Sequence, residues 1–266
     1  MIGADISGWQ RGLTMPELKD KGVEFVIIKA TQGTHLVDAC GADFYLAARD
    51  AGIPMGVYSY SEAVTPRQAR EEAEYLLSAL RGFPQPCGVF MDVETPEQLR
   101  LPNYELQETV AAWCSTIRSA GCRPGVYSSE LSAWSKLDPA ALGEDVLVWV
   151  AHYGKAPDMP CDIWQFSESG TLPGREFKLD LDMVRSERFA ALVRGAAAAL
   201  TAAPSQSPPL APFDTVGADA LGGPFSDALG GPSPAITGAL QLLADYIRTP
   251  AFEQNFLRYI EGRREK

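Results

Sequence analysis

The sequence is poor in the residues that build metal centres and histidine-dependent catalytic sites. Only two of its 266 residues are histidines, whereas zinc sites and Ser-His-Asp triads rely on that side chain. Its five cysteines include no Cys-x-x-Cys pair, and an odd number of cysteines favours reduced, buried thiols over a disulfide framework. We therefore expect no metal site and no cofactor.

Positive charge and long apolar runs are also scarce. Lys and Arg number 23 against 34 Asp and Glu, a formal net charge of −11, which argues against nonspecific binding of nucleic acid or of an anionic membrane surface. No run of 18 apolar residues is present, so no membrane-spanning segment is expected. The first residues lack the basic and apolar parts of a secretory signal, which predicts synthesis in the cytoplasm without a signal peptide.

Up to about residue 184, short β-rich segments alternate with helix-like stretches. This alternation predicts a parallel sheet, and eight strands predict closure into an irregular TIM-like (β/α) barrel, an α/β fold. The links between the later strands are short, so we expect incomplete helices in the second half. The expected strands cover residues 2–6, 25–29, 55–60, 89–93, 125–127, 146–150, 162–166 and 177–183, and the expected helices cover 15–21, 39–51, 66–80 and 104–120.

The most informative short string is Asp92-Val93-Glu94, which ends the apolar run 88–91. Side chains alternate faces along a strand, so the two carboxyl groups share one face at its end. Neighbouring carboxylates cannot both ionise easily, and one pKa should rise. Glycosidases use a neutral carboxylic acid beside an ionised carboxylate to cleave the glycosidic bond. For this string alone, however, a pair of solvated surface residues is the simpler interpretation.

Other acidic residues lie on the first and last expected strands. Asp5 ends the first strand, and Asp180 and Asp182 lie on the eighth at a spacing that puts them on one face. Reactive groups of such barrels sit at the C-terminal ends of the strands, and strands one and eight are neighbours in a closed barrel. We therefore expect these acids to lie close to Asp92 and Glu94 at one end of the barrel, which we call its mouth.

Aromatic residues mark several of the same strand ends. Core packing accounts equally well for each of them taken alone, but a groove of aromatic rings with polar partners suits the apolar faces of sugar rings. These residues are Trp9, Tyr58, Tyr60, Tyr127, Trp149, Tyr153 and Trp164.

Eight segments, in order along residues 1–185, resemble those of the family 25 glycoside hydrolases, a family of lysozymes. The string Phe90-Met91-Asp92-Val93-Glu94 resembles the fourth-strand motif, which carries the family's catalytic pair. Two positions depart from the pattern, because Ser59 stands where many members have His and Asp182 stands where Asn is common. The other matching segments begin at Asp5, Phe25, Gly56, Gly125, Trp149, Asp162 and Leu179.

The resemblance implies an enzyme, an N-acetylmuramidase that cleaves the β-1,4 bond between N-acetylmuramic acid and N-acetylglucosamine in peptidoglycan with retention of configuration. By the same resemblance, Glu94 is the general acid and Asp92 its ionised partner, while Asp5 and Asp180 hold the sugar and tune the pair. The residues expected to contact the substrate are Lys29, Tyr58, Tyr60, Tyr127, Trp149, Gln165 and Asp182.

The last 70 residues lie outside the resemblance. Residues 195–234 are rich in Ala, Pro, Gly and Ser, which predicts a linker between a catalytic barrel over 1–194 and the end of the chain. Residues 235–266 carry apolar side chains at helical spacing on either side of Pro250, which predicts a small helical hairpin. Its apolar stripes need cover, from the barrel, from a second copy in a homo-oligomer, or from a wall or phage component.

Three function classes remain open at this stage. The first is an active muramidase, a phage or prophage endolysin that reaches the cell wall after holin-dependent release. The second is a catalytically silent glycan-binding module on the same fold, which has no need for a general acid at Glu94. The third is a wall-degrading component of a phage particle or injection device.

Overall fold

The computed structural model describes residues 1–80 and 83–202, and its central feature is a nine-stranded sheet. The strands are β1 (Ile2–Ile6), β2 (Val23–Gln32), β3 (Leu36–Val37), β4 (Met55–Tyr60), β5 (Val89–Asp92), β6 (Pro124–Ser129), β7 (Leu147–Ala151), β8 (Ile163–Gly170) and β9 (Leu179–Val184). The α-helices are α1 (Met15–Asp20), α2 (Gly41–Asp50), α3 (Pro66–Ala79), α4 (Pro96–Arg100), α5 (Asn103–Ser119), α6 (Pro139–Leu142) and α7 (Glu187–Ala202), with short 3-10 turns η1 (Gly8–Gln10) and η2 (Ala133–Ser135).

Eight of the strands close into a barrel, which confirms the predicted fold class. They follow the order β1-β9-β8-β7-β6-β5-β4-β2, and a parallel pairing of β1 with β2 closes the ring. β3 is an additional edge strand, antiparallel to β2.

The expectation of a wholly parallel sheet is wrong for the last strand. β9 runs antiparallel to both of its neighbours, β1 and β8. The connection from β8 to β9 is a hairpin link of eight residues, 171–178, and parallel strands need a longer crossover connection. The N-terminal end of β9, rather than its C-terminal end, therefore lies beside the C-terminal end of β1.

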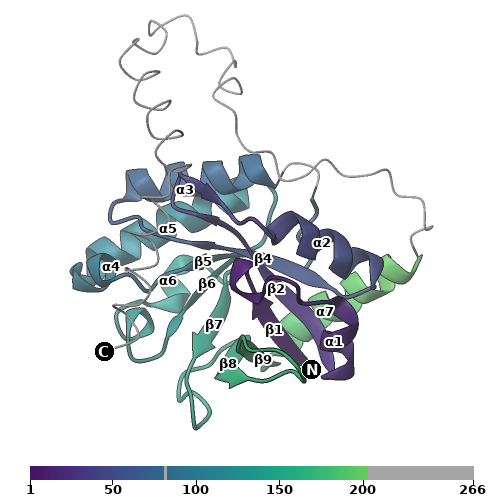
Figure 1. Cartoon of the computed structure of the whole chain (residues 1–266). Helices are drawn as coiled ribbons and strands as arrows, with labels where there is room; N and C mark the ends of the chain where they lie inside the picture. The colour runs from purple at the N-terminus through teal and green to yellow at the C-terminus, as the bar shows by residue number, and fades with distance from the viewer. Residues whose placement is uncertain (81–82, 203–266) are drawn as a thin grey trace, which may run out of the picture. The chain divides into compact units, whose positions relative to one another are not determined.

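Helices cover the two halves of the barrel unequally (Figure 1). α2, α3 and α5 follow β2, β4 and β5, and α3 and α5 pack side by side on the outside of the sheet. Between the start of β7 and the start of α7 the described chain contains no helix. This confirms the prediction of incomplete helices in the second half.

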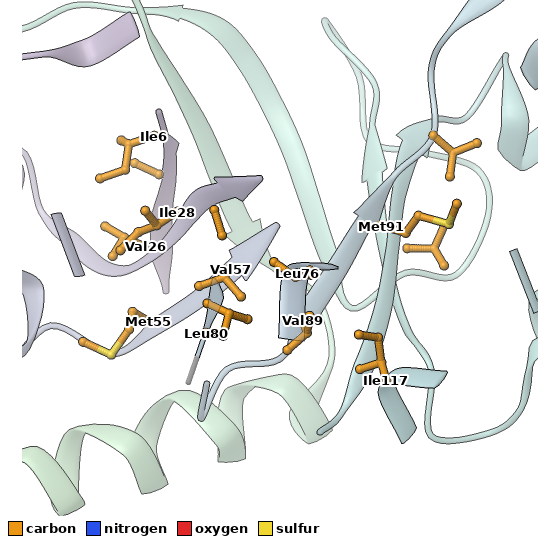
Figure 2. Close-up of a cluster of buried hydrophobic side chains, with 14 of the residues drawn as sticks. Ile6, Val26, Ile28, Met55, Val57, Leu76, Leu80, Val89, Met91 and Ile117 are labelled. Atoms are coloured by element: carbon orange, nitrogen blue, oxygen red, sulfur yellow. The ribbon is translucent and has the colours of Figure 1, made fainter. Parts of the chain in front are cut away.

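Two hydrophobic clusters lie on opposite faces of the strands. Along β5, Val89 and Met91 belong to an outer cluster beneath the helices, where they lie near Leu76 of α3 and Ile117 of α5 (Figure 2). Phe90, between them in sequence, belongs to an inner cluster that fills the barrel. The strand alternation predicted from the sequence therefore sets which side chains reach the interior.

Glycines make room for the large rings of the inner cluster. A Cβ at Gly3 would lie 2.2 Å from the Phe25 ring, and one at Gly125 would lie 2.3 Å from the Phe90 ring. Any larger residue would push these rings out of the barrel, so both positions require the close backbone approach that only glycine allows.

α7 closes one end of the barrel. Phe189 is fully buried and packs edge-on against Phe25, with ring centroids 5.3 Å apart. α7 continues to Ala202, eight residues beyond the predicted end of the catalytic barrel at residue 194, and Ala196 packs in the inner cluster. Ala196 therefore helps to cap the barrel, within the first residues of the predicted linker.

The remaining predictions for the tail lie outside the described residues. These are the rest of the linker up to residue 234, the helical hairpin over 235–266 and the homo-oligomer formed through it. Among the helices that the structure describes, none is both long and apolar enough to cross a membrane.

Candidate active site

Acidic residues from three strands converge at one end of the barrel, as the sequence predicted. Asp5 lies near the C-terminal end of β1 and pairs in register with Asp180 of the antiparallel β9. Asp92 is the last residue of β5. A cavity of about 380 Å³ opens beside Asp5 and Asp180, and it is lined by Asp5, Ile6, Ser7, Trp9, Gln10, Tyr58, Phe177, Lys178 and Asp180.

Asp92 and Glu94 differ sharply in their environments. Asp92 is 5% exposed, and its Oδ1 atom has no hydrogen-bond partner among the described residues. Glu94 lies just beyond β5, and its side chain reaches solvent. Loss of surrounding water raises the pKa of both carboxyl groups, and the charge of Glu94 raises that of Asp92 further. Such a pair titrates as a unit and holds a proton at higher pH than either group would alone.

Asp5 is held by an ordered chain of polar side chains. Gln165 of β8 donates a hydrogen bond from Nε2 to Asp5 Oδ2 at 2.8 Å. The hydroxyl groups of Tyr127 and Tyr153 both donate to Gln165 Oε1, at 2.9 Å and 2.7 Å. Because two donors occupy Oε1, the amide of Gln165 can only turn its N–H group toward Asp5.

Asp182 lies below Asp5, deeper in the barrel. It is fully buried, and Trp149 Nε1 donates to its Oδ1 atom at 2.8 Å. The carboxyl groups of Asp5 and Asp182 lie within reach of each other, a contact that becomes a hydrogen bond when one of them carries a proton. The two residues thus form a second acid pair beneath the mouth.

Burial is the main cause of the altered pKa values in this second group. It raises the pKa of Asp182 to about 8 and that of Asp180 to about 6. The pKa of Asp5 is raised well above its usual value by burial and by the charges of Asp182 and Asp180. Perturbed carboxyl groups gathered beside a cavity mark a candidate catalytic site.

Trp149 was expected to contact substrate, and the structure corrects this expectation. Its side chain is 1% exposed and packs under the mouth against Tyr58, Phe90 and Tyr127, with ring centroids 6.3 Å, 5.4 Å and 4.5 Å away. Asp182, also expected to contact substrate, has no exposed surface. Because large apolar rings fill the barrel interior, these two residues form the floor of the site and cannot touch a sugar at its surface.

The remaining expected substrate contacts lie at the mouth. Tyr58 is partly exposed beside the cavity, whereas Gln165 is 3% exposed and reaches the mouth only through its partners. Lys29 of β2 donates to Gln32 Oε1 at 3.0 Å and lies 5.0 Å from the centre of the Tyr60 ring. Burial lowers the pKa of Lys29, while the nearby carboxylates of Asp38, Asp92, Glu94 and Glu62 oppose that shift. Lys29 thus brings a positive charge to the electrostatic environment of Asp92 and Glu94.

Three further residues at this end of the barrel were not among the expected substrate contacts, although Trp9 and Tyr153 were among the strand-end aromatic residues that suit a glycan groove. Trp9 is 72% exposed at the cavity and Tyr153 is 43% exposed; both follow a strand end, which was the signal available in the sequence. Asp38 accepts hydrogen bonds from the backbone N–H groups of Gly8 and Cys40, at 3.0 Å and 2.9 Å. No pattern in the sequence indicated that Asp38 would fix the turn that carries Trp9.

The mouth contains carboxyl groups, yet no arrangement of ligands for a metal ion. Within residues 1–80 and 83–202, no group of three or more His, Cys, Asp or Glu side chains is placed to hold one.

The chain is similar in sequence and in fold to known lysozymes and endolysins. A family model described as glycosyl hydrolases family 25 matches residues 4–175. The autolytic lysozyme of Clostridium acetobutylicum is 30% identical over 68% of this chain, a match that spans only 55% of that relative's length. These matches show that the chain belongs to glycosyl hydrolase family 25.

Solved structures agree with that assignment. The catalytic domain of endolysin ply40 from bacteriophage P40 of Listeria monocytogenes is 26% identical with a TM-score of 0.60, and the match covers 73% of this chain and 97% of that domain. The bacterial lysozyme from Streptomyces coelicolor, at 22% identity and a TM-score of 0.60, covers 74% of this chain and 98% of its own and shares the fold.

Proposed function

We propose that this protein is an N-acetylmuramidase that hydrolyses the β-1,4 bond between N-acetylmuramic acid and N-acetylglucosamine in peptidoglycan. The observation that carries the proposal is the pair at the end of β5, a buried Asp92 beside a solvent-accessible Glu94. Membership of family 25 supports the same reaction class. A silent glycan-binding module has no use for two carboxyl groups with raised pKa values at this position.

Glu94 is the proposed general acid. Its side chain reaches solvent at the mouth, where a glycosidic oxygen can approach. Burial of its surroundings raises its pKa, although the positive charge of Lys29 opposes the shift. A carboxyl group that still carries a proton near the working pH can protonate the leaving sugar oxygen.

Asp92 is the proposed ionised partner, and the positive charge of Lys29, which opposes the rise of its pKa, favours that form. It cannot approach the leaving oxygen as freely as Glu94, because it is almost fully buried. Asp92 keeps a small exposed surface, 5%, through which the N–H group of a substrate acetamido group can approach its carboxyl group. A negative charge there orients the acetamido oxygen for attack on the anomeric carbon and stabilises the positive charge that develops, a substrate-assisted route that retains configuration.

The other mouth residues take supporting roles in this proposal. Asp5 and Asp180 accept hydrogen bonds from sugar hydroxyl groups in the cavity and adjust the charge around the pair. Tyr58, Tyr60 and Tyr127 contribute ring surfaces and hydroxyl groups for the glycan. Gln165 acts indirectly, since its amide orients Asp5.

We further propose that the physiological role is that of a phage or prophage endolysin. The similarity to the catalytic domain of a phage endolysin supports this role. Such an enzyme reaches the wall once a holin opens the membrane. Co-expression tests this role: lysis of the producing cells with a holin and none without it is expected, whereas lysis without the pore, or no lysis with it, contradicts the role.

The activity is tested by incubating purified peptidoglycan with the wild-type protein and with Glu94→Gln. We expect wild type to release muropeptides that end in N-acetylmuramic acid, identified by mass spectrometry after reduction, and NMR of fresh product to show the β-anomer first. Glu94→Gln should lower turnover by about 10²- to 10⁴-fold, the range of a lost general acid, with its melting temperature close to that of wild type. Near-normal turnover of Glu94→Gln would sink the general-acid assignment.

A further inference from the structure

Glu94 lies on the short connection between β5 and α4. Hydrogen bonds hold the backbone of this connection on both sides of Glu94, but they do not hold its carboxyl group. None of the hydrogen bonds between described residues reaches that carboxyl group. The direction in which it points therefore depends on the backbone between Val93 and Thr95. What holds that backbone also aims the proposed acid.

The peptide groups just before Glu94 are fixed by the two strands beside β5. The carbonyl oxygen of Asp92 accepts a hydrogen bond from Ser61 N at 3.0 Å. Val93 N donates to the carbonyl oxygen of Tyr127 at 2.9 Å, and the carbonyl oxygen of Val93 accepts from Ser128 Oγ at 2.7 Å. These bonds are local consequences of neighbouring strand ends.

The residue just after Glu94 is held by a side chain instead. Thr95 N donates to Gln98 Oε1 at 3.1 Å, and Gln98 N donates to Thr95 Oγ1 at 3.3 Å, which together form the capping box of α4. The amide of Gln98 then continues outward from α4, since Nε2 donates to Ser61 Oγ at 3.1 Å and to the carbonyl oxygen of Ala63 at 3.2 Å. The cap of α4 is thus tied to the connection between β4 and α3.

Glu72 of α3 closes this network. Ser61 Oγ donates to Glu72 Oε2 at 2.6 Å, and Glu62 N donates to Glu72 Oε1 at 3.0 Å. Gln98 and Ser61 have no exposed surface and Glu72 is 4% exposed. Burying a carboxyl group costs free energy unless it is fully bonded, so a carboxyl group kept at this position indicates a specific use.

The direction of each bond follows from the acceptors on Glu72. Because Ser61 gives its only proton to Glu72, its oxygen can only accept from Gln98. Gln98 must therefore turn Nε2 toward Ser61 and Oε1 toward Thr95 N. The carboxyl group on α3 decides, through two intermediates, how the residue after Glu94 is held.

We propose that Gln98, Ser61 and Glu72 are positioning residues that aim the Glu94 carboxyl group at the glycosidic oxygen. The inference rests on the proposed role of Glu94. The network does not bind the glycan, because it is buried, so it acts on the chemical step. Misplacing a catalytic group by about 1 Å can cost roughly 100-fold in rate.

The decisive variant is Gln98→Glu, with Gln68→Glu as its matched control. A glutamate at residue 98 still accepts from Thr95 N and keeps the capping box, but its second oxygen carries at most one proton, so it can no longer donate to both Ser61 Oγ and the carbonyl oxygen of Ala63 as Nε2 does. Gln68 lies at the matching position of α3, where its side chain accepts from Val64 N at 3.0 Å; it is half-buried and has no bond to the Glu94 connection. Both variants add one negative charge near a helix N-terminus.

We expect Gln98→Glu to lower kcat on soluble glycan strands by about 10- to 100-fold, with KM within about threefold of wild type. Gln68→Glu should change neither constant. In the Glu94→Gln background, Gln98→Glu should have almost no further effect on kcat, because the group that it misplaces is already gone. If Gln98→Glu does not fold, Ser61→Ala takes its place as the test. It removes the hydroxyl group that joins Gln98 to Glu72, with a smaller change in the side chain, and should also lower kcat.

Any of three results overturns the proposal. The first is an unchanged kcat in both Gln98→Glu and Ser61→Ala. The second is a loss of kcat in Gln68→Glu as large as that in Gln98→Glu, and the third is a full loss of kcat on adding Gln98→Glu to Glu94→Gln. These outcomes are distinct from failure of the proposed function, in which wild type cleaves no peptidoglycan or Glu94→Gln cleaves it normally. In that case both proposals fall together.

Discussion

The two halves of the barrel position acidic groups by different means. In the first half β4 and β5 lead directly into helices, and β2 leads into α2 through the short strand β3. Asp92 ends a strand that α3 and α5 cover, and Glu94 follows just beyond it. In the second half β8 turns directly into β9, and Asp180 and Asp182 lie on that returning hairpin strand.

This difference shows in what each half contributes to the site. The helix-covered half fixes the backbone around Glu94, through strand ends and through a buried network that links the β5–α4 connection to the β4–α3 connection and to α3. The hairpin half fixes side chains, through the chain of hydrogen bonds from Tyr127 and Tyr153 to Gln165 and Asp5. We infer that Asp92 and Glu94, in the first half, are the bond-breaking groups and that Asp180, in the second half, helps to hold the sugar and to set the local charge.

The sharpest test of this division compares Asp92→Asn with Asp180→Asn. We expect Asp92→Asn to lower kcat by about 10²- to 10³-fold, because it removes the charge that stabilises the transition state. Asp180→Asn should lower kcat/KM by about tenfold, as expected for a lost hydrogen bond to a bound ligand. Steady-state kinetics on soluble glycan strands measure both, and equal losses in kcat would remove the distinction between the halves.

A second test uses the buried acid on the hairpin side, Asp182. Its pKa rises from the usual 3.8 to about 8 on folding. Between those two values the folded protein keeps a proton that the unfolded chain releases, so this residue lowers stability progressively as pH rises from about 4 to about 8. Each unit of pKa difference corresponds to about 1.4 kcal/mol.

Asp182→Asn should therefore raise the melting temperature at pH 7 and have a much smaller effect at pH 4. The asparagine can still accept from Trp149 Nε1 and can donate to Asp5, so the floor of the site is preserved. Asp180→Asn is the control, and its gain at pH 7 should be smaller because the pKa of Asp180 rises only to about 6. Thermal melts across this pH range decide the matter, and a gain that does not vary with pH would contradict the ionisation argument.

The smallest expected effect concerns the ion pair that fastens the hairpin link. Arg175 donates from Nε to Glu17 Oε1 at 2.7 Å and from Nη2 to the carbonyl oxygen of Gly12 at 2.7 Å. It thereby ties the segment before Phe177 and Lys178, which line the cavity, to α1. Arg175→Ala should raise KM by about two- to fivefold, as expected from the ~0.2–1 kcal/mol of a part-exposed ion pair, and leave kcat near wild type. A large fall in kcat would show instead that the second half takes part in the chemical step.

The sequence predicted the elements around the site most accurately where the evidence was local. The expected strand over 89–93 matches β5, and the expected helix over 66–80 matches α3, at whose start Thr65 Oγ1 accepts from Gln68 N. It was less accurate where the expected contact with substrate depended on how deeply a side chain is buried in the barrel. Trp149 and Asp182 carry residue types that suit a glycan site, but only the packed rings around them reveal that no sugar can reach them.

By itself, the sequence determined the order of strands and helices, the placing of acidic residues at strand ends and the family, because these depend on residues within a few positions of each other. The tertiary structure alone decided that β9 runs antiparallel, that Asp182 lies beneath Asp5 and that Gln98 is bonded to Ser61, 37 residues earlier in the chain. Such contacts arise when the closing sheet brings distant segments into register. Their partners are chosen by the geometry of the whole barrel and leave no periodic or local signal in the chain.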